Sequence, residues 1–114
     1  MQVYLLRHGI AEEGGLGKSD ADRELTAEGR RRLRDILRIA AHAEVKPSLI
    51  VSSPLVRAVQ TAKIAAEILH YREPISESKV LLPYARFEHV WDEIRVHHDQ
   101  GELMLVGHDP LFSQ

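Results

Sequence analysis

The chain has 114 residues, enough for one domain, and its 44% hydrophobic and 28% charged residues are typical of a globular protein. The absence of cysteine excludes disulfides, thiolate metal ligands and thiol nucleophiles, and it fits a reducing compartment such as the cytoplasm. A net charge of −2 argues against a general nucleic-acid binder. Because no apolar run reaches membrane-spanning length and no signal-peptide pattern opens the chain, we expect a cytoplasmic protein without membrane contact.

The first predicted element is a short buried strand, indicated by the apolar run at residues 3–6. Arg7, His8 and Gly9 follow it directly. Open α/β sheets bind their ligands at the carboxyl ends of their strands. A cation and an imidazole at this point therefore indicate a functional site.

Residues 11–24 are polar and glycine-rich and predict a loop. A helix is expected to begin at Thr26, a residue type that caps helices, and to end before Pro47. Its apolar positions recur at helical spacing and arginines surround them, which indicates a solvated charged face; a docking surface for an acidic partner is the alternative. The apolar positions are Leu33, Ile36, Leu37 and Ala40, and the arginines are Arg30, Arg31, Arg32, Arg34 and Arg38.

Residues 49–51 predict a second buried strand, followed by a helix that continues through Leu69. Ser53 is the expected cap of this helix and Pro54 its first residue. Arg57 then lies in the first turn, where a positive charge opposes the helix dipole. An anion bound at this helix start would remove the conflict and would use the free backbone N–H groups.

Two further strands and a third helix are predicted in the second half of the chain. Residues 80–82 are the expected third strand, within an extended segment. Residues 85–99 are the expected third helix, with an apolar stripe that includes Trp91 and places it in the core. Residues 103–106 form the fourth apolar run and predict the last strand.

The fourth strand ends like the first, with a histidine beside a glycine, because Gly107 and His108 follow it. The next residue, Asp109, either orients His108 or caps a following helix, and we favour the cap.

Strands and helices alternate throughout, which predicts an α/β fold with three α/β/α layers and a mostly parallel central sheet. The loops at the carboxyl ends of the strands then share one edge. This arrangement brings Arg7, His8, Arg57 and His108 within reach of one another.

These four side chains suit a phosphoryl group. Arginine forks and a helix N-terminus match phosphate oxygens. A neutral histidine nitrogen can attack phosphorus when its other nitrogen is held as a donor, often to a backbone carbonyl. A second histidine, protonated, can stabilise the charge. No spacing of histidines or carboxylates is typical of a metal site, so neither a metal nor another cofactor is expected.

Four segments resemble the signatures of the histidine phosphatase superfamily, which has the phosphoglycerate mutase-like fold, and they occur in the family's order. They are Leu6-Arg7-His8-Gly9, Leu25-Thr26-x-x-Gly29, Ser52-Ser53-Pro54-Leu55-x-Arg57-Ala58-x-Gln60-Thr61-Ala62 and Val106-Gly107-His108. The resemblance implies that His8 is the nucleophile and forms a phosphohistidine intermediate that water hydrolyses. It also implies that Arg7, Gly9, Arg57 and His108 bind the phosphoryl group. Within the superfamily, the chain is most similar to the SixA-type phosphohistidine phosphatases.

The chain departs from the family pattern in two places. Larger members carry a general-acid glutamate after the third strand; here Tyr84 stands at the aligned position and Glu88 follows further on, so the acid is Tyr84, Glu88 or absent. Without an acid an alkoxide leaves poorly, whereas imidazole is a better leaving group, and this favours a phosphohistidine substrate. Family members also continue with another helix and usually an edge strand. We therefore expect residues 1–114 to form a single catalytic domain that lacks both.

Taken together, the sequence predicts a metal-independent phosphatase that acts through a phosphohistidine on His8, with phosphohistidine in a protein as the substrate. A small-molecule phosphomonoesterase of the same superfamily is the first alternative. A non-catalytic phosphoprotein-binding module is the second. The chain has no inserted subdomain that could act as a lid, which disfavours a mutase and suits a phosphoryl group carried on a protein.

Overall fold

The computed structural model describes residues 1–13, 17–109 and 111–113. Its centre is a parallel four-stranded sheet in the order β1-β4-β2-β3. The strands are β1 (Gln2–Arg7), β2 (Leu49–Ser52), β3 (Ser76–Glu77) and β4 (Glu102–Gly107). This confirms the predicted α/β class with a parallel sheet.

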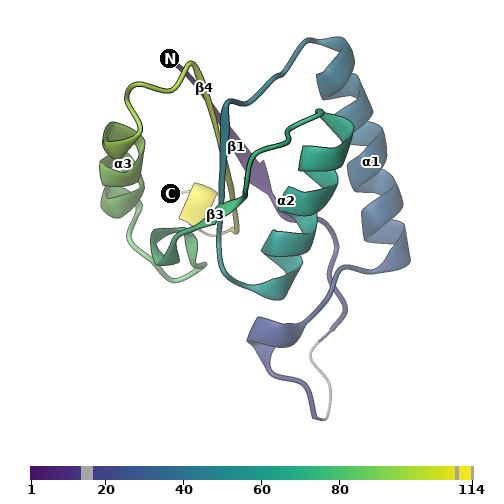
Figure 1. Cartoon of the computed structure of the whole chain (residues 1–114). Coiled ribbons are helices and arrows are strands. Elements are labelled where there is room, and N and C mark those ends of the chain that lie inside the picture. Colours follow the sequence, from purple (N-terminus) through teal and green to yellow (C-terminus); the bar gives the residue numbers. More distant parts are fainter. Residues whose placement is uncertain (14–16, 110, 114) are drawn as a thin grey trace.

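Helices cover both faces of the sheet (Figure 1). On one face lie α1 (Ala27–His42) and α2 (Val56–Ile68), and on the other lies α3 (Phe87–Val96). Three short 3-10 turns complete the described elements; they are η1 (Asp20–Asp22), η2 (Lys79–Leu81) and η3 (Leu111–Ser113). None of the described helices is both long and apolar enough to cross a lipid bilayer.

The central strand β4 divides the core into two clusters because successive side chains of a strand point to opposite faces. Met104 and Val106 pack beneath α1 and α2. Leu103 and Leu105 pack on the other face, against Val90 of α3. All five side chains are buried, so β4 is covered on both sides, as a strand inside a three-layer fold must be.

The start of α1 is fixed directly onto the segment that follows His8. Thr26 caps the helix as predicted, since its side chain accepts from the Gly29 N–H at 2.9 Å. The Thr26 N–H in turn donates to the carbonyl of Ile10. A Cβ atom at Gly29 would lie only 2.3 Å from that carbonyl oxygen. Glycine is therefore required here because helix backbone packs against loop backbone.

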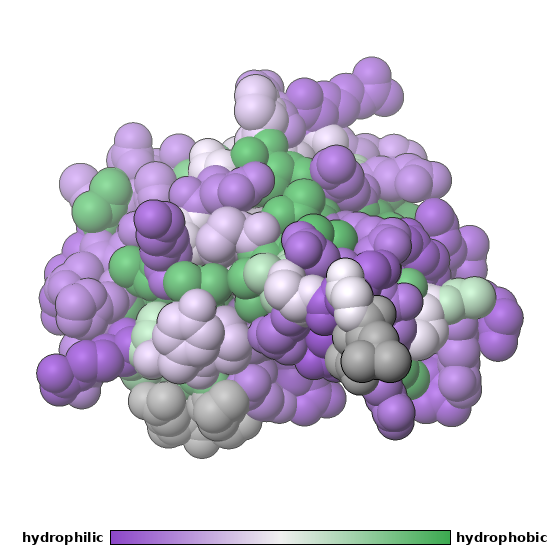
Figure 2. Space-filling model, turned by 90° about the horizontal axis from the view of Figure 1, so that it is seen from below, coloured by the Kyte–Doolittle hydropathy of each residue, from purple (hydrophilic) through white to green (hydrophobic). Residues whose placement is uncertain are grey.

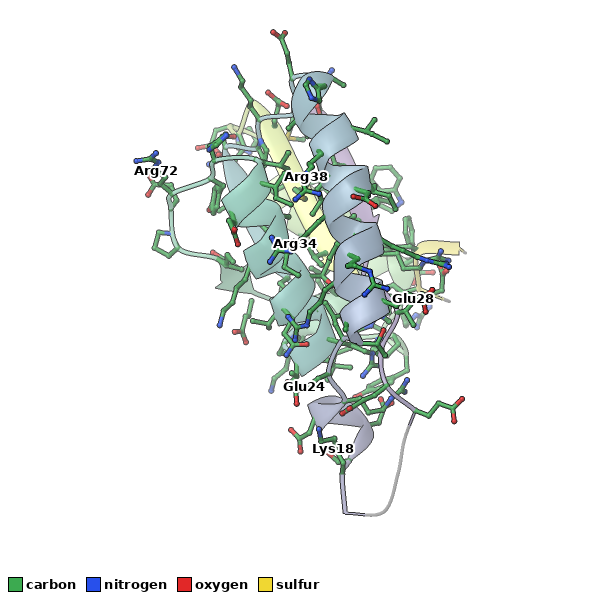
Figure 3. All side chains as sticks on the ribbon, turned by 90° about the vertical axis from the view of Figure 1, so that its right-hand side faces the viewer. Lys18, Glu24, Glu28, Arg34, Arg38 and Arg72 are labelled. Carbon is green, nitrogen blue, oxygen red and sulfur yellow. The ribbon has the colours of Figure 1, made fainter. Side chains whose placement is uncertain are left out.

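The arginines of α1 lie on the outer surface of the helical layer, where Arg34 and Arg38 are labelled in Figure 3. Arg34 pairs with Glu67 of α2 at 3.6 Å, and Arg38 pairs with Asp35 of its own helix at 3.2 Å. These pairings to carboxylates agree with the interpretation of a solvated charged face.

The second helix begins later than predicted. Its first residue is Val56 and its cap position is Leu55, not Ser53. The Ser53 hydroxyl instead accepts from the Leu55 N–H at 3.3 Å and contacts His108, so it serves the turn before the helix and the neighbouring strand.

The prediction of a third strand at residues 80–82 was wrong. The strand that pairs with β2 is Ser76–Glu77, and residues 79–81 form η2, in which the Ser78 side chain accepts from the Val80 N–H. The apolar character that suggested a strand has another cause, because Leu81 fills the core from this turn and is fully buried.

The third helix is shorter than predicted, and Trp91 does not lie in the core. The helix spans Phe87–Val96, and the Trp91 side chain is 52% exposed, in edge-to-face contact with Phe87. Val90 supplies the fully buried position of this helix, so only a narrow stripe of α3 faces the sheet.

Strand β1 lies at the edge of the sheet, and apolar side chains are exposed beside it. They include Leu5 of the strand and Ile36 of α1, which lines a groove together with Leu6 of β1. Seen from below, at the end where β1 finishes, the surface is mainly hydrophilic with hydrophobic residues gathered between the polar groups (Figure 2). The expected absence of a C-terminal helix and edge strand stays a prediction.

We expect Gly29→Ala to destabilise the fold, although alanine normally favours a helix interior by about 0.5–1 kcal/mol. The added Cβ would force α1 away from Ile10. Overpacking of this kind costs about 1–3 kcal/mol in the free energy of unfolding, which urea denaturation measures. Gly101→Ala is the matched control because no atom lies within 4 Å of its Cβ position. Equal stability of the two variants would contradict the close approach.

Candidate active site

The pairing of β1 with β4 brings two distant histidines together. Arg7 is in register with Gly107, and the His8 N–H donates to the Gly107 carbonyl at 3.0 Å. His108 directly follows Gly107, the last residue of β4. The ring centroids of His8 and His108 are 4.9 Å apart, with an angle of 60° between the rings. Both histidines therefore stand at the carboxyl edge of the sheet, as predicted.

The tautomer of His8 is fixed by a backbone carbonyl of the adjacent residue. Its Nδ1 lies 2.6 Å from the Gly9 carbonyl oxygen, which can only accept, so Nδ1 carries the proton. Nε2 is then unprotonated, and its lone pair accepts a hydrogen bond from the Nε–H of Arg57, with 3.4 Å between the two nitrogens. This arrangement matches the tautomer that sequence reasoning required of a nucleophile.

The surroundings of His8 keep its imidazole neutral. Burial lowers the pKa of His8 below its ordinary value of 6.5, and the hydrogen bond to Gly9 opposes this shift. The positive charges of Arg57, Arg23 and Arg7 lower the pKa further. An unprotonated Nε2 is thus the resting state of His8 near neutral pH.

Arg57 is buried in the first turn of α2, and its guanidinium is hydrogen-bonded by the loop between β1 and α1. Its Nη1 donates to the Asp20 backbone carbonyl at 2.7 Å, and its Nη2 donates to the Asp20 carboxylate at 3.3 Å. Arg23 donates to the same carboxylate at 2.8 Å. The loop thus supplies Asp20 and Arg23 to the site, and sequence reasoning gave neither of them a role. Arg57 is the signal from which these two residues could have been predicted. An arginine in the first turn of a helix calls for a nearby carboxylate as much as for an anionic ligand.

The loop is held in shape by its own charges. The Lys18 ammonium bonds to Glu12 at 2.6 Å and to Glu24 at 3.3 Å (Figure 3). Arg23 also donates to the Glu12 backbone carbonyl at 2.7 Å. These contacts join the two ends of the loop below the sheet, beside the residues that it sends to Arg57.

Thr61 ties α2 to the segment that carries His8. Its hydroxyl accepts from the Gly9 N–H at 3.3 Å and donates to the Arg57 carbonyl, one helical turn earlier, at 2.8 Å. The side chain is fully buried. Thr61 lay within the recognised segment of residues 52–62 but received no role from the sequence.

His108 is buried with only one of its nitrogens bonded. Its Nε2 lies 2.7 Å from the Ser53 hydroxyl, and among the described residues its buried Nδ1 has no hydrogen-bond partner. Burial lowers the pKa of His108 to about 3, with help from His8 and Arg57 and against the influence of Asp20. His108 is therefore neutral in the resting site, whereas the sequence analysis considered a protonated second histidine as a means of stabilising the phosphoryl charge.

Arg7 stands at the rim rather than inside the cluster. Its side chain is 67% exposed, and its guanidinium pairs with the carboxylate of Asp109. This pairing is neither of the two roles expected for Asp109. Arg7 still acts on the site through space, since its charge lowers the pKa of His8. The structure therefore brings His8, Arg57 and His108 into direct contact and leaves Arg7 beside them.

The two residues considered as general acids lie away from these contacts. Tyr84 is 78% exposed. Glu88 lies in the first turn of α3, on the face of the sheet opposite to α2, and accepts from Arg86 at 3.1 Å. Its pKa is lowered by a backbone N–H and by Arg86, so the carboxyl is ionised near neutral pH. No hydrogen bond in the described part of the chain joins either residue to Nε2 of His8, whose partner there is Arg57.

A groove of about 240 Å³ opens beside His8, and it is lined by residues 6–10 together with Gly29, Arg32, Leu33 and Ile36 of α1. Its walls are more apolar than polar, with cations from Arg7 and Arg32. In the described part of the chain, no three histidine or acidic side chains gather as metal ligands would.

The profile of the histidine phosphatase superfamily, branch 1, matches residues 3–82, and the chain belongs to this superfamily. It is thus a hydrolase of the histidine phosphatase type. An uncharacterized protein of Picosynechococcus is 32% identical over 96% of this chain and 67% of its own length.

Two solved structures resemble the fold closely. A protein of Agrobacterium tumefaciens described as phosphohistidine phosphatase SixA is 32% identical, with a TM-score of 0.87 over 96% of this chain and 70% of that one. The protein histidine phosphatase SixA complexed with tungstate is 25% identical, with a TM-score of 0.90 over 97% of this chain and 71% of that one. The chain is therefore similar to SixA phosphohistidine phosphatases, as the sequence motifs indicated.

We expect His108 to make the stability of the fold depend on pH. Its pKa is about 3 in the folded chain and returns to about 6.5 on unfolding, so below pH 6.5 the unfolded state binds a proton that the folded state does not. The stability that the fold has while His108 is neutral in both states is fully present above pH 6.5. It is lost progressively as the pH falls towards 3. The free energy of unfolding should therefore fall more steeply between pH 6.5 and about pH 4 in the wild type than in His108→Gln. Urea denaturation at each pH measures it, and equal slopes would contradict a buried neutral His108.

Proposed function

We propose that this chain hydrolyses a phosphoryl group through a covalent intermediate on His8, with phosphohistidine in a protein as its substrate. One observation carries the proposal. Nδ1 of His8 donates to the Gly9 carbonyl, so that the lone pair of Nε2 faces the guanidinium of Arg57. A phosphate-binding cation thereby lies directly beside the nitrogen that would attack phosphorus.

In the first step, Nε2 of His8 attacks phosphorus and the bond from phosphorus to the leaving group breaks. His8 keeps its proton on Nδ1, where the Gly9 carbonyl holds it. The phosphorylated ring is then a cation next to that carbonyl. When the leaving group is the imidazole of a substrate histidine that carries a proton on its other nitrogen, it departs as a neutral molecule and requires no acid from the enzyme.

In the second step, water attacks phosphorus and Nε2 of His8 leaves as a neutral imidazole nitrogen. The protons of the water stay with the phosphate or pass to solvent, and the starting tautomer of His8 is restored. Because the leaving nitrogen belongs to a ring still protonated on Nδ1, this step also proceeds without an acid at the leaving group.

The roles of the other residues follow from their positions. Arg57 presents its Nε–H to the phosphoryl oxygens next to His8, and Arg7 adds charge from the rim. His108 contacts the same group from the buried side. Gly9 supplies the carbonyl that fixes His8, and its own N–H is held by Thr61. A phosphoryl group bound here competes with the Asp20 carboxylate for Arg57.

A phosphohistidine substrate is supported by the fact that, among the described residues, no carboxyl or phenol group hydrogen-bonds to Nε2 of His8. The Asp20 carboxylate bonds to Arg57 of the cluster, and its pKa is lowered by Arg23 and Arg57. It is thus ionised and unable to donate. An alkoxide would then leave without a proton, which slows reactions of alkyl phosphates far more than those of phosphoramidates.

We expect His8→Ala to reduce phosphate release by about a thousandfold or more, since the variant has no nitrogen to carry the intermediate. Circular dichroism should show an intact fold. The control is His42→Ala, because His42 is an exposed residue near the end of α1. Brief mixing of the wild type with labelled substrate should yield an acid-labile phosphorylated chain that His8→Ala does not form. Undiminished turnover in His8→Ala would overturn the nucleophile assignment.

The leaving group should control the rate strongly. We expect phosphohistidine in a carrier protein to react fastest, aryl phosphates more slowly, and alkyl phosphates such as glycerol phosphate slowest, because only the last demand a proton from an acid. Steady-state kcat/KM values for the three classes under matched conditions test this. Comparable values for alkyl phosphates would favour the small-molecule phosphomonoesterase. Saturable binding without phosphate release would favour a binding module.

A further inference from the structure

Ser53 meets His108 at the buried end of the site, and nothing in the proposed reaction yet uses this contact. Ser53 directly follows β2, and its backbone N–H donates to the Val106 carbonyl of β4 at 2.8 Å. Its side chain is fully buried, and its Oγ lies 2.7 Å from Nε2 of His108. The serine is thus fixed by the sheet itself, on the side of His108 away from solvent.

The direction of the hydrogen bond between Ser53 and His108 follows from counting protons. A hydroxyl has one proton to donate and two lone pairs to accept with. One lone pair of Ser53 accepts from the Leu55 N–H at 3.3 Å. If Nε2 of His108 also donated to Ser53, the hydroxyl proton would be buried, and in the described part of the chain it would have no acceptor. The lone pair on Nδ1 of His108 would be unpartnered as well, whereas a donating serine leaves only the proton on Nδ1 without a partner among the described residues. The serine therefore donates and Nε2 accepts.

The remaining nitrogen of His108, Nδ1, is then a donor available to a ligand. With Nε2 accepting, a neutral imidazole carries its proton on Nδ1. Among the described residues, that buried nitrogen makes no hydrogen bond. The ring containing it stands edge to face against the ring of His8, with 4.9 Å between the centroids. A phosphoryl group on Nε2 of His8 adds acceptor oxygens at this point of the site.

We propose that Ser53 is a positioning residue that holds His108 in its neutral tautomer with the proton on Nδ1, so that an uncharged imidazole donates to the phosphoryl oxygens. This inference rests on the proposed function and deepens it. His108 then binds the phosphoryl group without first taking up a proton, and buries no charge beside Arg57 while the site is empty. The phosphate also leaves without having to be separated from an imidazolium.

The tautomer can be measured without turnover. Long-range ¹H–¹⁵N NMR spectra distinguish a protonated ring nitrogen from an unprotonated one, and His108→Gln identifies the signals. We expect His108 of the wild type near neutral pH to be protonated on Nδ1 alone. Protonation on Nε2 alone, or on both nitrogens, would overturn the proposal. If the tautomer is as expected but the protein releases no phosphate from any substrate, the proposed function fails and the assignment of Ser53 stands.

Ser53→Ala tests the cause. Without the donor at Nε2, we expect the Nδ1-protonated form of His108 to lose its dominance, and kcat/KM for phosphohistidine to fall about tenfold, as for other partners that orient an imidazole through its second nitrogen. Ser52→Ala is the matched control, because Ser52 is the adjacent, equally buried serine and its hydroxyl donates to the Ser53 carbonyl instead of to His108. It should leave the His108 spectrum unchanged.

A structural role alone would lower stability in both serine variants without changing the tautomer. An unchanged His108 spectrum in a folded Ser53→Ala protein would overturn the proposal. If Ser53→Ala does not fold, the wild-type spectrum still decides, because the proton count on Nδ1 and Nε2 is read there directly.

Discussion

The candidate site depends on one pairing, the parallel ladder between β1 and β4. These strands lie at opposite ends of the chain, yet their register sets Arg7 opposite Gly107, and the His8 N–H continues the ladder by one bond. A ladder displaced by one residue would turn the side chains that follow it to the wrong face. The distance between His8 and His108 is therefore a property of the sheet, whose central strand is buried on both faces and cannot slip.

Helix α2 also supports the site, through two contacts that lie one helical turn apart. Arg57 lies next to His8, and four residues later Thr61 holds the Gly9 N–H. The loop that follows β1 ends at α1, and the backbone of α1 touches Ile10 because Gly29 has no side chain. Thus the segment after β1 is fixed from both helices, and the orientation of the His8 ring follows from this packing.

Much of this could be predicted from the sequence because the signals were local. Short apolar runs marked β1, β2 and β4, and Thr26 marked the start of α1. The anion site expected from the arginine in the first turn of α2 stays a prediction. The third strand failed because β3 has only two residues, both exposed, so it carries no apolar pattern. The prediction that Trp91 lies in the core was wrong because helical periodicity gives the direction of a side chain but not the width of the surface that covers it.

Several contacts that sequence reasoning missed join residues distant in the chain. Ser53 looked like a helix cap, and only the neighbouring strand makes it a partner of His108. Asp20 looked like one polar residue in a polar loop. Asp109 had a partner on β1, Arg7, which no local pattern could reveal. The neutral state of His108 in the resting site could not be predicted, because burial causes it and burial is not visible from the neighbouring residues in the chain.

The bond between Asp20 and Arg57 links the loop to the helix. A buried guanidinium requires a counter-charge, and the loop provides it through one carboxylate and one carbonyl. Any anion that takes Arg57 from this carboxylate removes part of what orders the loop, and a well-ordered loop opposes the arriving anion to the same extent. Loop order and anion affinity are therefore thermodynamically linked, and a substitution in one must appear in the other.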